Sequence, residues 1–280
     1  MAKTSIYKTE KGKAQVQNFY EELLSDWHQP SNEILLETKY GTTFILESGI
    51  KEAPAIILLH GSGSNLAMWK ADVMELSKTF HVFAVDIIGE CGKSSENRPT
   101  FKNGNYLGWM NEILDKLDLK KVSVIGCSLG GWIALDFAIN HPKKIDKLVL
   151  MATAGITQVK TKTILWIIVT SMFGNWGFKQ LNKMVYGNLS IDSKAMEFAS
   201  LIKKHFKPRT EVLPIVTDRL LQKIKAKTLF IGGENDCFYN SHKTSNRLKE
   251  NLYDVKCVVL RNTGHVLLDQ TKTLVQFLRN

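Results

Sequence analysis

Short runs of consecutive apolar residues alternate along this chain with longer segments in which apolar residues recur every three or four positions. A run that is apolar throughout predicts a strand buried on both faces of a parallel sheet, whereas the three-to-four spacing predicts an amphipathic helix. Strands are expected at residues 55–59, 81–86, 122–126, 147–151, 226–233 and 254–261, and helices near 66–78, 104–118, 133–140, 241–252 and the C-terminus. This alternation predicts the α/β class, with a mostly parallel, doubly wound sheet.

Two further elements come before this alternation. Residues 11–28 have helical spacing and are followed by Pro30, so they predict an amphipathic helix that ends there. Residues 34–38 and 43–47 are strand-like runs joined by a short segment that contains Gly41, which predicts a β-hairpin.

The alternation stops after Met151 and resumes at Ala226. Residues 155–215 are helix-like throughout and rich in large apolar side chains and lysine. We therefore predict one core domain, made of residues 1–154 and 216–280, with a helical insertion at 155–215.

Composition narrows the class of protein. A chain of 280 residues with 44% hydrophobic residues can bury a substantial core. The net charge is +10, but the lysines are scattered and no nucleic-acid motif is present, so we expect a solvated basic surface and no nucleic acid partner. The oligomeric state, monomer or homodimer, stays open.

Targeting signals are absent from the sequence pattern. The first residues lack the apolar core of a signal peptide. The longest apolar run, residues 164–173, is shorter than the roughly 20 residues that span a bilayer. The four cysteines have no disulfide-scaffold spacing. We expect a cytoplasmic protein with reduced thiols and no integral membrane segment.

A Gly-x-Ser-x-Gly motif lies where the strand at 122–126 meets the following helix: Gly126, Cys127, Ser128, Leu129 and Gly130. Strand, sharp turn and helix are the context of a nucleophile elbow, in which the serine is exposed at the top of a sheet and at a helix N-terminus. The alternative is a serine in an ordinary strand-to-helix turn. The candidate partners described next favour the nucleophile.

A serine hydroxyl needs a base and a residue that orients that base. Of the seven histidines, only His265 lies just past a late strand, in a Gly-His loop. Asp236 directly follows the strand at 226–233 and is the candidate acid, with Glu234 on the same loop as the alternative. Asp86 also ends a strand, but it precedes the serine and is expected to brace a loop.

The oxyanion of a tetrahedral intermediate needs preorganised donors. We expect the backbone N–H groups of Leu129, which follows the serine, and of Ser62, in the glycine-rich loop after the strand at 55–59. His60 is expected to brace this loop. The loop lacks the Gly-Lys-Ser/Thr ending of a phosphate-binding loop, which argues against nucleotide binding.

The ordered motifs HGSGSN, VDIIGECGKS, GCSLGG, GGEND and NTGH resemble those of the α/β-hydrolase superfamily over almost the whole chain beyond residue 40. The stretches YKTEKGKAQVQNFYEELLSDW and AVDIIGECGKS, and residues 109–131, are similar to bacterial carboxylesterases of the naproxen-ester-cleaving type. The resemblance implies a soluble enzyme without metal or organic cofactor. It also implies a Ser128, Asp236 and His265 triad, oxyanion donors at Ser62 and Leu129, and a cap at 155–215.

Serine at the elbow, rather than aspartate, excludes haloalkane dehalogenases and epoxide hydrolases and indicates attack on a carbonyl. We therefore predict hydrolysis of small-molecule carboxylic esters through an acyl-enzyme. The cap carries many large apolar side chains, which favours neutral hydrophobic esters of small to medium size. Trp166, Phe173 and Trp176 are candidate substrate contacts, although packing of the cap onto the core would explain each of them too.

Other activities use the same machinery. The alternatives are a C–C bond hydrolase of the meta-cleavage-product type, a thioesterase or lactonase, and a slow-turnover, ligand-sensing protein built on a hydrolase fold. Cys127 and Cys237 flank Ser128 and Asp236 in sequence, and we expect them to be packed bystanders rather than a redox switch.

Overall fold

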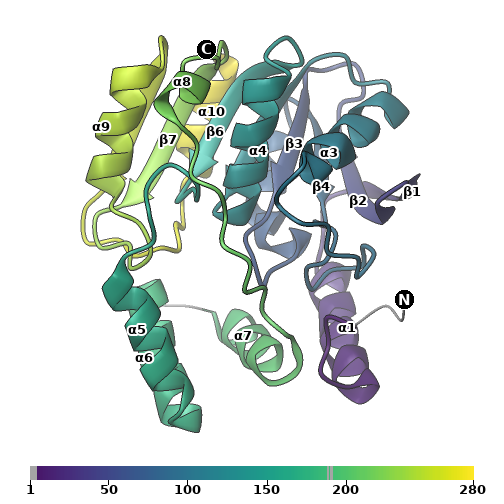
Figure 1. Cartoon of the computed structure of the whole chain (residues 1–280). Helices are drawn as coiled ribbons and strands as arrows, with labels where there is room; N and C mark the ends of the chain where they lie inside the picture. The colour runs from purple at the N-terminus through teal and green to yellow at the C-terminus, as the bar shows by residue number, and fades with distance from the viewer. Residues whose placement is uncertain (1–4, 188, 190–191) are drawn as a thin grey trace.

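The structure of the protein, a computed structural model, describes residues 5–187, 189 and 192–280. Its centre is an eight-stranded sheet in the order β1-β2-β4-β3-β5-β6-β7-β8 (Figure 1). The strands are β1 Ser31–Thr38, β2 Gly41–Gly49, β3 Ala55–Leu59, β4 His81–Val85, β5 Val122–Cys127, β6 Ile145–Met151, β7 Lys227–Gly233 and β8 Val255–Leu260. Strand β2 is antiparallel to β1 and β4, and all other neighbours are parallel. The mostly parallel sheet and the hairpin are confirmed.

Helices cover both faces of the sheet. They are α1 Glu10–Ser25, α2 Lys70–Leu76, α3 Asn105–Lys116, α4 Leu129–Asn140, α5 Thr161–Ser171, α6 Gly174–Tyr186, α7 Ser193–His205, α8 Asp218–Leu221, α9 Ser241–Asn251 and α10 Thr271–Arg279, with a 3-10 turn, η1, at Leu66–Trp69. Helices α3, α4, α8 and α9 contribute to one buried cluster, whereas α1, α2 and α10 contribute to a second. The predicted doubly wound arrangement is therefore confirmed.

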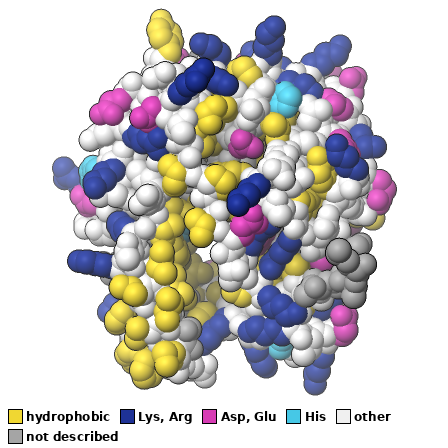
Figure 2. Space-filling view, viewed as in Figure 1, with side chains coloured by type: hydrophobic (Ala, Val, Ile, Leu, Met, Phe, Trp, Pro, Cys, Tyr) yellow, Lys and Arg dark blue, Asp and Glu magenta, His cyan; other side chains and the backbone are white. Residues whose placement is uncertain are grey.

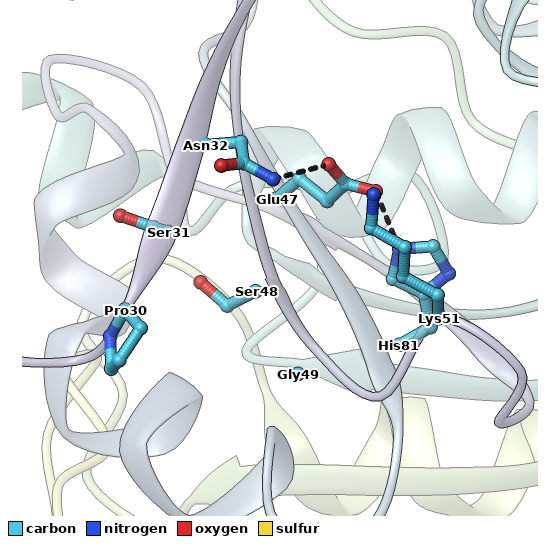
Figure 3. Close-up of a pocket in the computed structure, with 8 residues that line it drawn as sticks. All are labelled: Pro30, Ser31, Asn32, Glu47, Ser48, Gly49, Lys51 and His81. Atoms are coloured by element: carbon cyan, nitrogen blue, oxygen red, sulfur yellow. Dashed lines mark hydrogen bonds and ion pairs between the residues drawn. The ribbon is translucent and has the colours of Figure 1, made fainter.

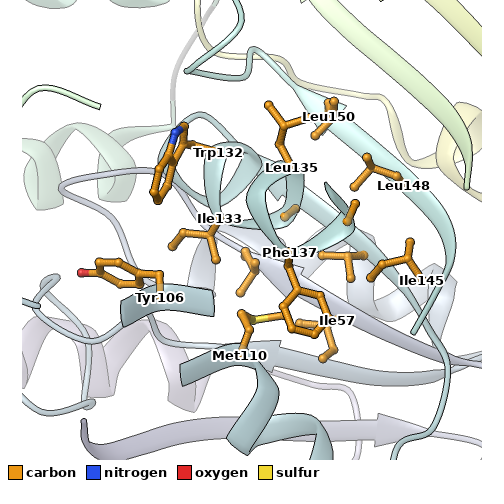
Figure 4. Close-up of a cluster of buried hydrophobic side chains, with 14 of the residues drawn as sticks. Ile57, Tyr106, Met110, Trp132, Ile133, Leu135, Phe137, Ile145, Leu148 and Leu150 are labelled. Carbon is orange, nitrogen blue, oxygen red and sulfur yellow. The ribbon is translucent and has the colours of Figure 1, made fainter. Parts of the chain in front are cut away.

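The continuous apolar runs are explained by these two clusters. In β3, Ile57 and Leu59 belong to the cluster under α3 and α4, part of which is shown in Figure 4, while Ile56 and Leu58 belong to the cluster on the other face. Successive side chains of a strand point to opposite faces, so a strand covered on both sides needs apolar residues at every position.

The helix expected at residues 66–78 is divided into η1 and α2. The first two N–H groups of this segment are bonded to side chains: Leu66 donates to Asp86 Oδ1 at 2.8 Å and Ala67 to Asn65 Oδ1 at 3.2 Å. These bonds tie the first turn to the loop after β4, and the α-helix begins one turn later.

Helices α5, α6 and α7 occur between β6 and α8 in the chain, within the predicted cap. Helices α5 and α6 pack together as a helical hairpin that projects away from the sheet, whereas α7 packs on α1 (Figure 1). Residues 206–217 contain no helix, contrary to the helical expectation, because Pro208 and Pro214 interrupt the segment. The division into core and cap at 155–215 stays a prediction. No helix in the described ranges combines the length and the apolar character needed to cross a membrane.

Strand β5 and helix α4 approach closely beneath the serine, and this approach gives a test. A Cβ atom at Gly126 would lie 2.3 Å from the carbonyl oxygen of Gly130, whereas one at Gly61 would find only ordinary contacts, 3.6 Å or more away. We expect Gly126→Ala to lower the free energy of unfolding by about 1–3 kcal/mol in urea denaturation, and Gly61→Ala to stay close to wild type. Equal stability of the two variants would contradict this packing argument.

Candidate active site

Ser128 occupies a strained turn between β5 and α4. Its backbone has φ 49° and ψ −105°, in a region that residues with a Cβ atom rarely adopt. The turn is pinned because Ser128 N–H donates to Met151 O at 2.9 Å and Ser128 O accepts from the N–H of Trp132 at 3.0 Å. A Cβ atom at Gly130 would lie 2.3 Å from the carbonyl oxygen of Leu59, so glycine is required for α4 to start this close to β3.

His265 connects this serine to a buried carboxylate. Its Nε2 atom is 3.2 Å from Ser128 Oγ, and its Nδ1 atom is 2.9 Å from Asp236 Oδ2. Asp236 is fully buried, and its other oxygen accepts the N–H groups of Phe238 at 2.7 Å and Tyr239 at 3.1 Å. With a proton on Nδ1 donated to Asp236, Nε2 is free to accept the proton of the serine hydroxyl.

The two other carboxylates considered from the sequence lie elsewhere. Glu234 is exposed, and its Oε2 accepts the N–H of Asn262 at 3.2 Å. Asp86 accepts hydrogen bonds from the N–H groups of Leu66 and Lys93 and from the hydroxyl of Tyr20, at 2.7 to 2.9 Å. Burial raises the pKa of Asp86 to about 6. Asp86 thus joins α1 to the loops after β3 and β4.

The glycine-rich loop after β3 lies against the elbow. A Cβ atom at Gly61 would be 3.6 Å from Ser128 Cβ. Across the described part of the chain, the backbone N–H groups of Ser62 and Leu129 have no hydrogen-bond acceptor. An oxyanion site requires free N–H donors close to the serine, and Ser62 and Leu129 directly follow Gly61 and Ser128, the two residues that meet here.

The side chain of His60 holds this loop through two hydrogen bonds to the backbone. Its Nδ1–H donates to Gly61 O at 2.8 Å, and its Nε2 accepts the N–H of Ile87 at 2.9 Å, so both ring nitrogens of the neutral imidazole are used. Burial lowers the pKa of His60 to about 4. The ring is therefore uncharged at neutral pH and adds no charge beside the serine.

Glu90 is a residue of this site that sequence reasoning missed. It is buried, and its Oε2 accepts the N–H of Gly63 at 2.7 Å and the hydroxyl of Ser62 at 3.3 Å. Burial raises the pKa of this carboxyl, and its Oε1 has no partner within the described residues. No motif spacing singles out Glu90, because its contact depends on two loops that approach each other only in the folded chain.

The three predicted substrate contacts lie on the α5–α6 hairpin. Trp166, Phe173 and Trp176 are 42%, 55% and 53% exposed, and the last two rings pack edge to face with centroids 5.6 Å apart. Trp166 borders a cavity of about 290 Å³ together with Lys162, Thr163 and Met184. Their role in substrate binding stays a prediction.

A second cavity, of about 180 Å³, lies near the start of β4 and is lined in part by Glu47 and His81, whose side chains hydrogen bond (Figure 3). Strands β4 and β5 are both parallel to β3. Ser128 follows the C-terminal end of β5, whereas this cavity lies at the N-terminal end of β4, so the two lie at opposite ends of the strands. Among the described residues, no group of three or more His, Cys, Asp or Glu could hold a metal ion.

Comparison with known proteins agrees with the fold. A family model described as alpha/beta hydrolase fold matches residues 54–193. Carboxylesterase YbfK of Bacillus subtilis is 27% identical over 89% of this chain and 86% of its own. Its crystal structure has a TM-score of 0.85 at 25% identity, covering 96% of this chain and 97% of that one.

Two more similarities concern the two types of hydrolase considered from the sequence, the naproxen-ester-cleaving carboxylesterases and the C–C bond hydrolases. The crystal structure of naproxen esterase from Bacillus subtilis has a TM-score of 0.83 at 23% identity, over 97% of this chain and 99% of that one, which shows a shared fold. A 2-hydroxymuconate semialdehyde hydrolase of Pseudomonas sp. (strain CF600) is 36% identical, but over only 36% of this chain and 37% of its own. The predicted resemblance to bacterial carboxylesterases is confirmed.

The reactivity of Cys127 and Cys237, which neighbour Ser128 and Asp236 in the sequence, tests whether their thiols are buried. Burial raises the pKa of Cys127 and of Cys237 to about 12, so almost no thiolate is present at pH 8. We expect iodoacetamide to leave both cysteines unmodified in the folded protein and to alkylate both in guanidinium chloride, as measured by peptide mass spectrometry. Rapid alkylation of Cys127 in the folded protein would contradict its role as a packed bystander.

Proposed function

The chain belongs to the α/β-hydrolase family and is an enzyme of the carboxylesterase type, and on this basis we propose that it hydrolyses carboxylic esters through Ser128, His265 and Asp236. The observation that carries the proposal is the continuous set of contacts from Ser128 Oγ through the imidazole of His265 to the buried carboxylate of Asp236. The N–H groups of Ser62 and Leu129, which have no acceptor among the described residues, support it further.

In the proposed reaction, Ser128 Oγ attacks the ester carbonyl while His265 Nε2 accepts its proton. The N–H groups of Ser62 and Leu129 stabilise the oxyanion, and Asp236 stabilises the imidazolium that forms. His265 then protonates the leaving alcohol and the acyl-enzyme forms. A water molecule, deprotonated by the same imidazole, attacks the acyl group and releases the acid.

The proposed substrates are neutral hydrophobic esters of small to medium size. This proposal rests on the apolar character of the inserted helices. It is tested with p-nitrophenyl esters of increasing acyl length. A preference for charged acyl groups would contradict it.

Substitution of the three residues tests the mechanism. We expect Ser128→Ala and His265→Ala each to lower kcat for p-nitrophenyl butyrate by about 10⁴–10⁶-fold, and Asp236→Asn by about 10⁴-fold, because the imidazole would lose its orienting partner. Glu234→Gln is the matched control on the same loop and should stay near wild type. Loss of activity in Glu234→Gln with a nearly active Asp236→Asn would show the acid assignment to be wrong.

Labelling with a fluorophosphonate tests the nucleophile independently of substrate choice. We expect one covalent adduct, mapped by mass spectrometry to Ser128 and missing from Ser128→Ala. An adduct elsewhere, or none on the folded protein, would overturn the proposal.

Glu90 provides a test of the oxyanion loop. Because Glu90 Oε2 accepts the Gly63 N–H beside Ser62, we expect Glu90→Ala to lower kcat by up to about 10²-fold, the cost of one oxyanion donor, with KM little changed. Glu90→Gln keeps an oxygen acceptor and should restore most of the activity. A rise in KM at unchanged kcat would place Glu90 in substrate binding instead.

The partial similarity to a 2-hydroxymuconate semialdehyde hydrolase keeps C–C bond hydrolysis as the second candidate. Steady-state kinetics with p-nitrophenyl esters and with a vinylogous 1,5-diketone distinguish the two. A kcat/KM higher for the diketone would favour the second candidate, whereas a stoichiometric burst of p-nitrophenol without turnover would favour a ligand-sensing protein.

A further inference from the structure

In the α5–α6 hairpin, large apolar side chains are exposed and some polar ones are buried, the reverse of the usual arrangement. The outer surface of α5, of the turn after it and of the first turn of α6 is apolar: Leu165, Trp166, Val169, Met172, Phe173 and Trp176 are between 42% and 78% exposed, and we call these six the hairpin face. By contrast, Thr163 and Thr170 on the inner side of α5 are buried. Figure 2 shows the hydrophobic side chains gathered over this hairpin in one continuous area. Apolar areas of this kind mark interaction sites.

The inner surfaces of the hairpin are already occupied. Helix α6 packs on α5 at Gly177, where a Cβ atom would collide with the carbonyl oxygen of Thr170. Lys203 from α7 donates to Gly174 O at 2.7 Å and lies 4.4 Å from the centre of the Phe178 ring. These contacts fix the hairpin with its apolar side outward.

Charge identifies the kind of partner that fits this face. Residues 147–191 contain no Asp or Glu, whereas Lys160, Lys162, Lys179 and Lys183 all lie on or beside the hairpin, and the last three are exposed. A second copy of the chain, packed symmetrically, would bring these lysines against their like-charged equivalents. An anionic surface attracts them instead, and Trp, Phe and Leu beside Lys is the composition of helices that lie at the surface of a bilayer.

We propose that the hairpin face docks on the surface of an anionic lipid bilayer. Leu165, Val169 and Met172 enter the boundary between headgroups and acyl chains, while the exposed lysines contact the anionic headgroups. The binding is peripheral, along the outer side of α5. It does not depend on the proposed esterase activity.

The hairpin is joined at both ends to the loops that carry the acid and the base. Before α5, Lys160 N–H donates to Phe238 O at 2.8 Å, and the Thr163 hydroxyl donates to Cys237 O. At the end of α6, Val185 O accepts the N–H of His265 at 3.0 Å. Docking through this face therefore brings the Ser128 side of the molecule next to the lipid, where hydrophobic esters partition.

Vesicle co-sedimentation tests the proposal. We expect the wild-type protein and Ser128→Ala alike to bind vesicles of phosphatidylcholine and phosphatidylglycerol, with an affinity that falls as salt is added, and to bind phosphatidylcholine vesicles at least about tenfold more weakly. Leu165→Gln/Val169→Gln/Met172→Gln should weaken binding to the anionic vesicles by at least about tenfold. Lys162→Gln/Lys179→Gln/Lys183→Gln should remove the difference between the two lipid mixtures.

A matched control separates the hairpin face from exposed apolar surface in general. Leu35→Gln/Met74→Gln/Val212→Gln removes three comparably exposed apolar side chains elsewhere on the molecule and should bind as wild type does. Thermal unfolding and turnover of a soluble ester verify that each variant is folded. Absence of wild-type binding to the anionic vesicles, or an equal loss in the control variant, would overturn the proposal. So would a dimer that the hairpin variant converts to monomer, because the face would then be an interface between copies.

Discussion

The close approach of three backbone segments at Ser128 is the constraint on which the rest of the site depends. Glycine at 126 and 130 allows β5, α4 and the end of β3 to approach within distances that a Cβ atom would prevent. The serine backbone is strained as a result, and the surrounding hydrogen bonds over-determine its conformation. The same closeness brings the loop after β3 against Ser128, where a Cβ atom at Gly61 would be 3.6 Å from Ser128 Cβ. The positions of Ser128 and of this loop therefore share one structural cause.

In the loops next to this turn, burial is the main cause of the shifted pKa values of His60, Asp86 and Glu90. Burial lowers the pKa of His60 and keeps the ring neutral, while both ring nitrogens hydrogen bond to backbone groups. Asp86 and Glu90 both have raised pKa values for the same reason, and both accept backbone N–H groups from the segment after β3. Buried polar side chains thereby fix the position of a loop that has no regular secondary structure of its own.

The inserted helices differ from the core in where their apolar side chains lie. In the core, each apolar residue of β3 is covered on its own face of the sheet. On α5 most of the apolar residues are exposed, whereas Thr163 and Thr170 are buried, because α5 packs on α6 at Gly177 and on the loop after β7 through Thr163. The lipid surface that we propose as the partner of this hairpin would cover the apolar side chains that the core leaves exposed.

Local patterns in the sequence determined the class of fold, the position of the elbow, and the choice of Ser128, His265 and Asp236 as candidates, because each depends on neighbours within a few residues or on its place after a strand. Only the tertiary structure could separate Asp236 from Glu234, since the two lie on one loop and differ in which carboxylate reaches His265. It alone revealed Glu90, which contacts Gly63 across two loops. It also decided which side of α5 faces solvent, because a helix apolar nearly all round carries no periodicity that would orient it.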